Sequence, residues 1–555
     1  MQCFERNPRK RPPKFGRCAP NRPTVRDLRH KPLKPLNLFS GQPLRHSANG
    51  VRQVTSVTSC SGALSNNRVV IGPRLLHTGW GYEPMMTQVH EEFRGLPAGN
   101  TRFLTCFCVG AVALILLWPA LMNGFPFIYY DTGTYLKAAL SRTIPWDRPV
   151  FYSIFALLLH WKYSLWPIVV AQALVVSALI QLTANLIFGI KSTLGTILTG
   201  LVLAAASSLP WFVGQIMPDI FTSVLILSIL LITIAWHRMK SIERWFALAL
   251  IPVSVSFHYA SCLIALSMIP ALALMYLTGW RPGPYAYQRM LLIGAAIVIG
   301  VAGIIGSNLI SKKRKITLSP SSYTFLFAKL LEDDRALAVL EEACPGGSVL
   351  CSQLSRLQAQ SPASRADYFL WYGPLADLGW WKEVEPDAAK LVKRILSRYW
   401  RVYIVHAVIG SYHQFLSIKI GDQLGRIEED SVPLSELFGA DVSAKYRSSM
   451  QARGLLRLDL VNGIISFVAI ISGIVLIFSL VAPPSGGQDI RYAAALLIVF
   501  LIGNAVVIGS LSPLHDRYQS RVVWLVPLFG VLALIRFLSK PLGQVRACGE
   551  AAADH

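Results

Sequence analysis

The feature that most constrains this chain is a series of apolar runs, each long enough to cross a membrane. A spanning helix needs about 20 largely apolar residues, and about ten such runs can be placed along the chain. They lie at 103–122, 164–187, 192–210, 219–236, 245–257, 259–277, 290–310, 459–482, 491–511 and 522–538. Since 53% of the 555 residues are hydrophobic and only 15% are charged, the predicted fold class is an all-α polytopic membrane protein with about ten transmembrane helices.

Residues 311–458 interrupt this series. The region is mixed in polarity and far too long for a turn, so we expect a mainly helical extracytoplasmic domain inserted between spans. An amphipathic helix is predicted within it from Asp387 onward. The insertion separates an N-terminal transmembrane module, 85–310, from C-terminal transmembrane helices, 459–538, and a cytoplasmic tail, 539–555.

Residues 1–84 form a basic N-terminal extension. The net charge of the chain is +23, and about half of that excess lies here, in a segment rich in Arg, Pro and Ser. It cannot bury a core, so we expect it to be disordered, and its charge does not indicate a nucleic-acid partner. We expect the natural start at Met85 or Met86, with 1–84 a misassigned extension. The alternative is a transit or interaction tail, because an Arg-rich, acid-poor start also fits organellar targeting.

The sidedness of the loops follows from the span count. If the first span starts in the cytoplasm, the loops on the far side are 123–163, 211–218, 258, 311–458 and 512–521. Basic residues at 236–245 and 279–290 favour this orientation by the positive-inside rule. The basic run SKKRKITL, 311–318, conflicts with it. One misassigned span would explain the conflict, and the best candidate is 399–418, which we interpret as an amphipathic helix on the membrane surface.

This count brings Asp131, Asp147, Asp219, His258 and the stretch 515–521 to one face of the membrane. Five separate parts of the chain contribute them, as expected for a functional site. The alternative is chance, because ionisable residues gather near span ends in any case.

Two motifs follow the first span. Asp131 lies in YYDTGTYL near the predicted start of a short helix, where an Asp often serves only as the N-cap. Downstream, WDRPVFY places Asp147 and Arg148 at the start of a hydrophobic helix that we expect to rest in the membrane interface.

The segments DTGTY (131–135) and DRPVFY (147–152) resemble motifs of the GT-C superfamily of glycosyltransferases that use polyprenyl-phosphate sugars, within its protein-mannosyltransferase-like branch. The resemblance covers mainly residues 103–235. It implies that Asp131 is the general base that deprotonates the acceptor hydroxyl. Acids are often paired in the family's external loops, whereas Thr132 follows Asp131 here, so a divalent metal is only an open possibility and no cofactor is expected with certainty.

The stretch SPLHDRYQSRVV is similar to the Arg-Tyr-bearing start of a late span in the same superfamily. The resemblance implies that Arg517 and Arg521 bind the donor phosphate, a task that suits the planar guanidinium. The alternative is that both are snorkelling anchors at a span end.

Further candidates for binding the substrate or the donor phosphate are Asp147, Arg148, Asp219, His258 and His515. Asp219 follows Pro218, so it also fits an ordinary helix start. For His258 we favour a turn between two short spans over a phosphate contact. His515 and Asp516 adjoin Arg517 and are expected to orient it.

Two other clusters in the insertion have side chains that could form a disulfide or bind an ion. Cys344 and Cys351 are spaced like a local pair, which would form a disulfide if the insertion faces an oxidising compartment. Glu332, Asp333 and Asp334 could bind a divalent ion, but runs of acids are usually solvated.

The sequence holds no P-loop, dinucleotide fingerprint or HExxH motif. We therefore expect an inverting membrane glycosyltransferase that moves a sugar from a polyprenyl-phosphate donor to a glycan, lipid or protein acceptor. Its site would face the periplasm from the bacterial inner membrane. The alternative is a transporter or flippase of a lipid-linked or polysaccharide unit, although no internal repeat was found. A scaffold without chemistry is the third possibility.

Overall fold

The computed structural model describes residues 98–277, 286–311, 316–428, 431–483 and 487–538. The chain divides into two units, Met1–Glu83 and Pro84–His555, and all described residues belong to the second. In this described part the regular elements are helices, with one isolated bridge between Phe127 and Gln215. The all-α prediction is thus confirmed, whereas the expectations for 1–84 and 539–555 lie outside the described residues.

Six described helical segments are long and apolar enough to cross a membrane. They are α6 (Trp166–Leu186), α9 (Ile220–Ala235) with the 3-10 turn η1 (Trp236–Arg238), α12 (Ala286–Ile310), α21 (Asp459–Val481), α22 (Gln488–Leu511), and α23 (Arg517–Val523) with α24 (Leu525–Leu538). Shorter apolar stretches lie in α2 (Ala98–Leu116), α5 (Phe151–His160), α7 (Thr193–Ala206) and α11 (Tyr259–Leu277). These apolar helices indicate a membrane protein, and the count of ten spans stays a prediction.

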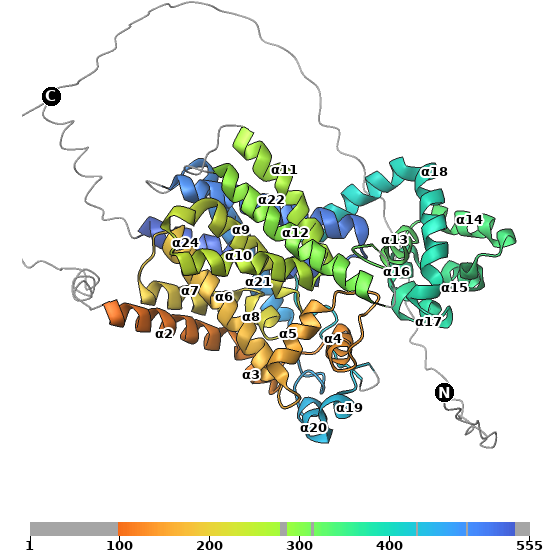
Figure 1. Cartoon of the computed structure of the whole chain (residues 1–555), viewed down its shortest axis with the longest axis horizontal. Coiled ribbons are helices and arrows are strands. Elements are labelled where there is room, and N and C mark those ends of the chain that lie inside the picture. The colour runs from red at the N-terminus through yellow and green to blue at the C-terminus, as the bar shows by residue number, and fades with distance from the viewer. Residues whose placement is uncertain (1–97, 278–285, 312–315, 429–430, 484–486, 539–555) are drawn as a thin grey trace, which may run out of the picture. The chain divides into compact units, whose positions relative to one another are not determined.

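Helix α9 is the centre of the bundle. All of its residues from Ile220 to Ala235 are buried, as expected for a helix that is apolar on every side. It contacts α6, α10 (Ser241–Phe257), α12 and α22. The bundle is completed by α2 packed on α6 and α7, and by α21 packed on α24 (Figure 1). Asp219 directly precedes α9, so this buried acid lies at the N-terminal end of the central helix.

In two places the observed helix ends before the apolar run that predicted it. The run from 103 breaks before Pro119, where α3 (Trp118–Asn123) follows α2. The run from 192 breaks before Pro210, where α8 (Leu209–Val213) follows α7. In both cases the proline sits in the first turn of the new helix, the position that tolerates its missing N–H.

The loop after α3 carries α4 (Tyr130–Leu140). The Tyr129 N–H donates to Thr132 Oγ1 at 2.9 Å, so Thr132 satisfies the start of this helix. Asp131 lies inside the first turn. The alternative interpretation of Asp131 as an N-cap is therefore wrong, and its carboxylate is available for other partners.

The inserted region contains two packing groups. One has its own hydrophobic core. It consists of α13 (Ser322–Leu330), α14 (Asp334–Ala343), η2 (Cys344–Gly346), η3 (Val349–Gln353), α15 (Leu354–Gln358), α16 (Pro362–Trp371), α17 (Pro374–Asp377) and the first part of α18 (Trp381–Leu416). The other, with α19 (Leu434–Phe438) and α20 (Ala440–Arg447), adds Ile420, Leu424 and Tyr446 to the core of the bundle. The helix predicted from Asp387 starts earlier, at Trp381.

The acidic run at 332–334 has internal partners. Glu332 pairs with Lys329 at 2.7 Å, and Asp334 pairs with Arg365 at 2.7 Å. Asp333 accepts a hydrogen bond from the Arg335 N–H at the start of α14. Each acid thus has a structural role within the fold.

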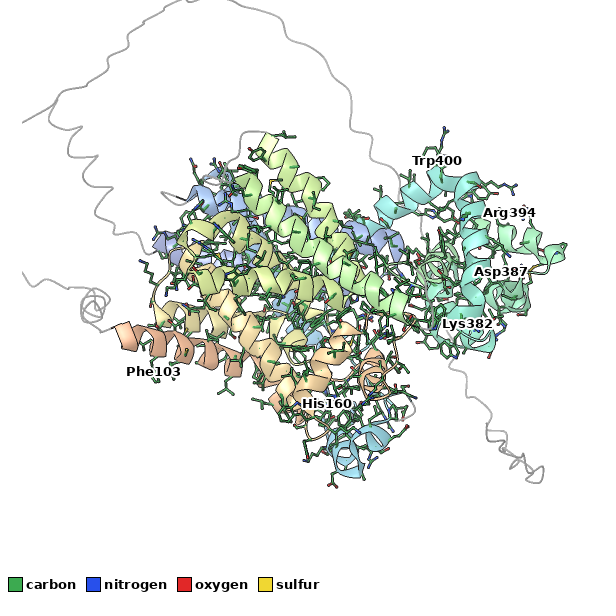
Figure 2. All side chains as sticks on the ribbon, viewed as in Figure 1. Phe103, His160, Lys382, Asp387, Arg394 and Trp400 are labelled. Atoms are coloured by element: carbon green, nitrogen blue, oxygen red, sulfur yellow. A yellow bond between two sulfur atoms is a disulfide. The ribbon has the colours of Figure 1, made fainter. Side chains whose placement is uncertain are left out.

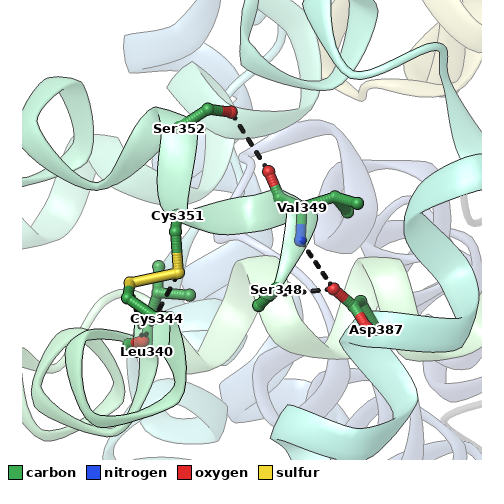
Figure 3. Close-up of a disulfide and its surroundings, with 7 residues drawn as sticks. All are labelled: Leu340, Cys344, Ser348, Val349, Cys351, Ser352 and Asp387. Atoms are coloured by element: carbon green, nitrogen blue, oxygen red, sulfur yellow. Dashed lines mark hydrogen bonds between the residues drawn. A yellow bond between two sulfur atoms is a disulfide. The ribbon is translucent and has the colours of Figure 1, made fainter. Parts of the chain in front are cut away.

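Cys344 and Cys351 form a disulfide between the end of α14 and η3 (Figure 3). Asp387 of α18 accepts hydrogen bonds from Ser348 Oγ at 2.9 Å and Val349 N–H at 2.8 Å. These two bonds therefore attach the loop that the disulfide closes, residues 344–351, to α18.

Replacing Cys344 by Ser is expected to lower the free energy of unfolding by about 2 kcal/mol. The loss is modest because a short ring restricts the unfolded chain only a little. Thermal unfolding of the purified protein would measure this loss. Cys106→Ser is the control, because Cys106 is an exposed free thiol and its loss should leave the transition unchanged. Equal transitions for Cys344→Ser and wild type would contradict the expectation.

Candidate active site

Asp131 lies between two arginines from distant parts of the chain. Its Oδ1 is 3.0 Å from Arg148 Nη1, and its Oδ2 is 3.4 Å from Arg517 Nη2, 386 residues away. Arg148 also pairs with its neighbour Asp147. The structure therefore brings together four of the predicted site residues, from the segment between α3 and α5 and from the start of α23.

A second pair lies deeper. Arg521 Nη1 is 3.1 Å from Asp219 Oδ1, and the side chains are 0% and 3% exposed. Arg521 Nη2 also donates to Asn504 Oδ1 of α22 at 3.2 Å. Arg521 follows Arg517 by four residues on α23, so both guanidinium groups lie on one face of that helix.

Aromatic rings line the same region. The guanidinium carbon of Arg517 is 4.9 Å from the Tyr518 ring centroid and 5.6 Å from that of Tyr129. Arg521 lies 5.4 Å from the Tyr518 ring. The rings hold the two cations in an apolar setting with cation–π contacts.

The two arginines keep unused hydrogen-bond donors. Within the described part of the chain, Arg517 Nε and Nη1 and Arg521 Nε are buried and have no hydrogen-bond partner. Buried N–H groups of a charged side chain are costly to leave unpaired. The arrangement thus offers three donor nitrogens from two cations, which an anion with several oxygens would satisfy.

Asp131 is a weak base in this resting arrangement. Burial raises the pKa of Asp131, but Arg148 and Arg517 lower it more, and the result is a pKa of about 2. The carboxylate is therefore fully ionised at neutral pH.

His258 lies at the turn between α10 and α11, where its Nδ1 accepts the Ala260 N–H at 3.1 Å. This agrees with the turn role that we favoured. The pKa of His258 is lowered to about 4, mainly by burial and next by the positive charge of Arg521.

His515 connects three segments. Its Nε2 is 3.3 Å from Asp367 of α16, and its Nδ1 is 3.1 Å from Asp422. Its backbone is held by Gln414 of α18, which donates to the His515 carbonyl at 2.8 Å and accepts from its N–H at 3.3 Å. Both ring nitrogens of His515 thus contact acids of other segments, and together they form a clamp that holds the inserted region to the start of α23.

The clamp should depend on pH. Burial lowers the pKa of His515, but Asp367 and Asp422 outweigh it and raise the pKa to about 10. Because the folded-state pKa lies above the ordinary value of about 6.5, the clamp's stabilisation is complete below that value and is lost as the pH rises towards 10. We expect the midpoint of thermal unfolding to fall over this range, and to fall less in His515→Gln. Parallel pH curves for the two proteins would contradict this.

Sequence reasoning missed the segment that packs against the start of α4, next to Asp131. After α18 the chain folds over α4, where the Tyr129 hydroxyl donates to the Asp422 carbonyl at 3.1 Å. The Gln451 side chain donates to the Ile128 carbonyl at 2.6 Å and accepts from its N–H at 3.1 Å. A β-carbon at Gly133 would lie 2.6 Å from the Ser431 carbonyl oxygen, so only glycine permits this approach. No motif marks Asp422, which lies in a polar loop, or Asp367, which lies in α16 next to aromatic residues.

Within the described residues no group of three or more His, Cys, Asp and Glu side chains is placed to hold a metal ion. Comparisons of the chain with protein-family models, curated proteins and solved structures found no match. The case for a function therefore rests on the geometry of the residues around Asp131.

Proposed function

We propose that this chain is a membrane glycosyltransferase of the GT-C type, which transfers a sugar from a polyprenyl-phosphate donor to a hydroxyl acceptor at the periplasmic face. The observation that carries the proposal is the set of unpaired donors on Arg517 and Arg521 next to the Asp131 carboxylate. Together they form an anion-binding group with a carboxylate beside it. Such a combination suits a reaction that releases a phosphate and consumes a hydroxyl proton.

In the proposed reaction the donor phosphate binds the free N–H groups of Arg517 and Arg521. The acceptor hydroxyl gives its proton to a carboxylate oxygen of Asp131 while its oxygen attacks the anomeric carbon. The bond between that carbon and the phosphate oxygen breaks, and its electron pair stays on the phosphate. The two guanidinium groups stabilise the charge that develops there.

The low pKa of Asp131 suggests how donor binding prepares the base. In the resting protein Arg148 and Arg517 hold that pKa at about 2, too low for an efficient base. A phosphate bound to Arg517 shares this cation with Asp131 and adds negative charge nearby. Both effects raise the pKa of the carboxylate, so the donor itself would make Asp131 a stronger base.

Glycan analysis of a deletion strain tests the proposal. The mass of one lipid-linked or surface glycan should fall by one sugar residue in the deletion strain. Wild type should restore the mass, and Asp131→Asn should not. Unchanged glycans would contradict the proposal. A complete lipid-linked glycan that accumulates without reaching the surface would instead support the flippase alternative.

A further inference from the structure

The inserted region exposes aromatic rings where α13, α16 and α18 meet. The ring centroid of Trp371 lies 6.3 Å from that of Phe325 and 6.1 Å from that of Trp381, and Phe325 stacks on Trp381 at 4.9 Å. Trp371 is 44% exposed, and the chain neighbours of the two tryptophans, Tyr372 and Trp380, are 70% and 52% exposed. We name Trp371, Tyr372 and Trp380 the aromatic surface. Because such residues are enriched at binding interfaces, it is a candidate binding surface.

Trp380 has a strained backbone. Its φ is 68°, in the left-handed region that bulky residues rarely adopt. The Trp380 N–H donates to the Leu375 carbonyl at 2.9 Å, which holds this conformation. Since half of the side chain is exposed, burial of the ring offsets only part of the strain. Strained residues cluster where ligands bind, which supports a binding role for this ring.

Helix α16 connects the aromatic surface with the candidate active site. Asp367 of α16 lies 3.3 Å from His515, which precedes Arg517 by two residues. Trp371 follows Asp367 by four residues, so both lie on one face of the helix, about 6 Å apart along its axis. The aromatic surface therefore begins about one helical turn from the contact with His515.

A second connection runs through Trp146. It packs against the same hydrophobic core as Phe325, and its carbonyl accepts a hydrogen bond from Ser321 Oγ at 3.1 Å. Arg148, the partner of Asp131, follows two residues later, a length of at most about 7 Å. An extended molecule with its reacting end at Asp131 would therefore have the aromatic surface within reach of its other end.

Charged side chains of both signs adjoin the rings. Arg356 pairs with Asp377 of α17, and a β-carbon at Gly373, beside the aromatic surface, would lie 3.0 Å from Arg356 Nη2. Lys382 and Glu383 are exposed at the start of α18 (Figure 2). Burial of these groups in a bilayer or under an apolar peptide would be costly.

A sugar ring matches both parts of this region. Its C–H groups carry partial positive charge and stack on the negative face of an aromatic ring. Its hydroxyl groups donate to carboxylates and accept from guanidinium and ammonium groups. The chemistry therefore favours a carbohydrate as the occupant.

We propose that the aromatic surface binds the sugar chain of an oligosaccharide acceptor, at units remote from the hydroxyl that reacts at Asp131. The inference rests on the proposed function, and it names a glycan rather than a lipid or a protein as the acceptor. Long acceptors gain binding energy from the rings, whereas short acceptors do not reach them.

Binding of oligosaccharides to the purified full chain tests the inference. The probe is the set of oligosaccharides released by mild acid from the lipid-linked and surface glycans of the deletion strain, sorted by size. In a titration without donor, followed by nuclear magnetic resonance, wild type should bind the longer chains. Trp380→Gly should bind them about tenfold more weakly, as expected for the loss of one tryptophan contact. Glycine suits the positive φ, so thermal unfolding should stay near that of wild type.

Trp400→Ala is the matched control. Trp400 is also 52% exposed, but it lies away from Lys382 along α18 (Figure 2), and its loss should leave binding unchanged. If Trp380→Gly unfolds at a lower temperature, Tyr372→Ala removes a more exposed ring and gives the same readout.

Three results would overturn the inference. They are absence of binding by wild type, equal binding by wild type and both aromatic-surface variants, and dimerisation of wild type that Trp380→Gly abolishes in light scattering, which would assign the surface to a second copy. Failure of the proposed function gives a different result, in which the oligosaccharides bind through the rings but no sugar is transferred when donor is added.

Discussion

Asp131→Asn is expected to lower the transfer rate by about 10²- to 10⁴-fold, the contribution of a general base. Asn keeps the size of the side chain but cannot accept the acceptor's proton. Thr132 satisfies the start of α4, so this substitution leaves the helix start intact. A rate assay with membrane vesicles and a lipid-linked sugar donor would measure the loss.

Two controls separate chemistry from folding. Thr132→Ala removes the bond at the start of α4 and the bond that the Thr132 hydroxyl donates to the Ile216 carbonyl at 3.0 Å. It should cost about 1–3 kcal/mol of stability without removing the base. Asp489→Asn breaks the exposed pair with Arg238 and should leave both stability and rate near wild type. Transfer by Asp131→Asn at the rate of Asp489→Asn would refute the role of Asp131.

The contact between Asp131 and Arg517 agrees with the predicted span count, which puts the loop of Asp131 and the start of α23 on one face of the membrane. Which arginine pairs with which aspartate could not be predicted. Arg517 and Arg521 are four residues apart on one helix, and only packing decides that Arg517 meets Asp131 while Arg521 meets Asp219. Hydrophobic periodicity predicts which helices form, but it does not specify which polar residues at their ends contact one another.

The boundaries of the helices and the role of the insertion were harder to predict. Apolar composition continues through Trp118 and Leu209, but Pro119 and Pro210 start new helices there. The loop with Asp422 carries no motif, yet it packs on α4 through a backbone contact that needs Gly133. Such long-range contacts leave no periodic signal in the sequence.

Arg521→Met is expected to lower the free energy of unfolding by about 3–5 kcal/mol, because it leaves the Asp219 carboxylate buried without its partner. Asp219→Leu should cost a similar amount, since it strands the Arg521 cation. The double variant removes both charges, and apolar replacements of a buried ion pair are often neutral or stabilising. Its thermal unfolding in detergent should therefore return close to that of wild type.

The double variant then separates structure from function. If Arg521 only neutralises Asp219, the double variant, which is stable again, should transfer sugar at the wild-type rate. If Arg521 also supplies its free Nε–H to the donor phosphate, the rate stays low although stability has returned, because no other side chain replaces that donor. Recovery of both stability and rate would restrict phosphate binding to Arg517, and recovery of stability alone would assign both arginines to the donor.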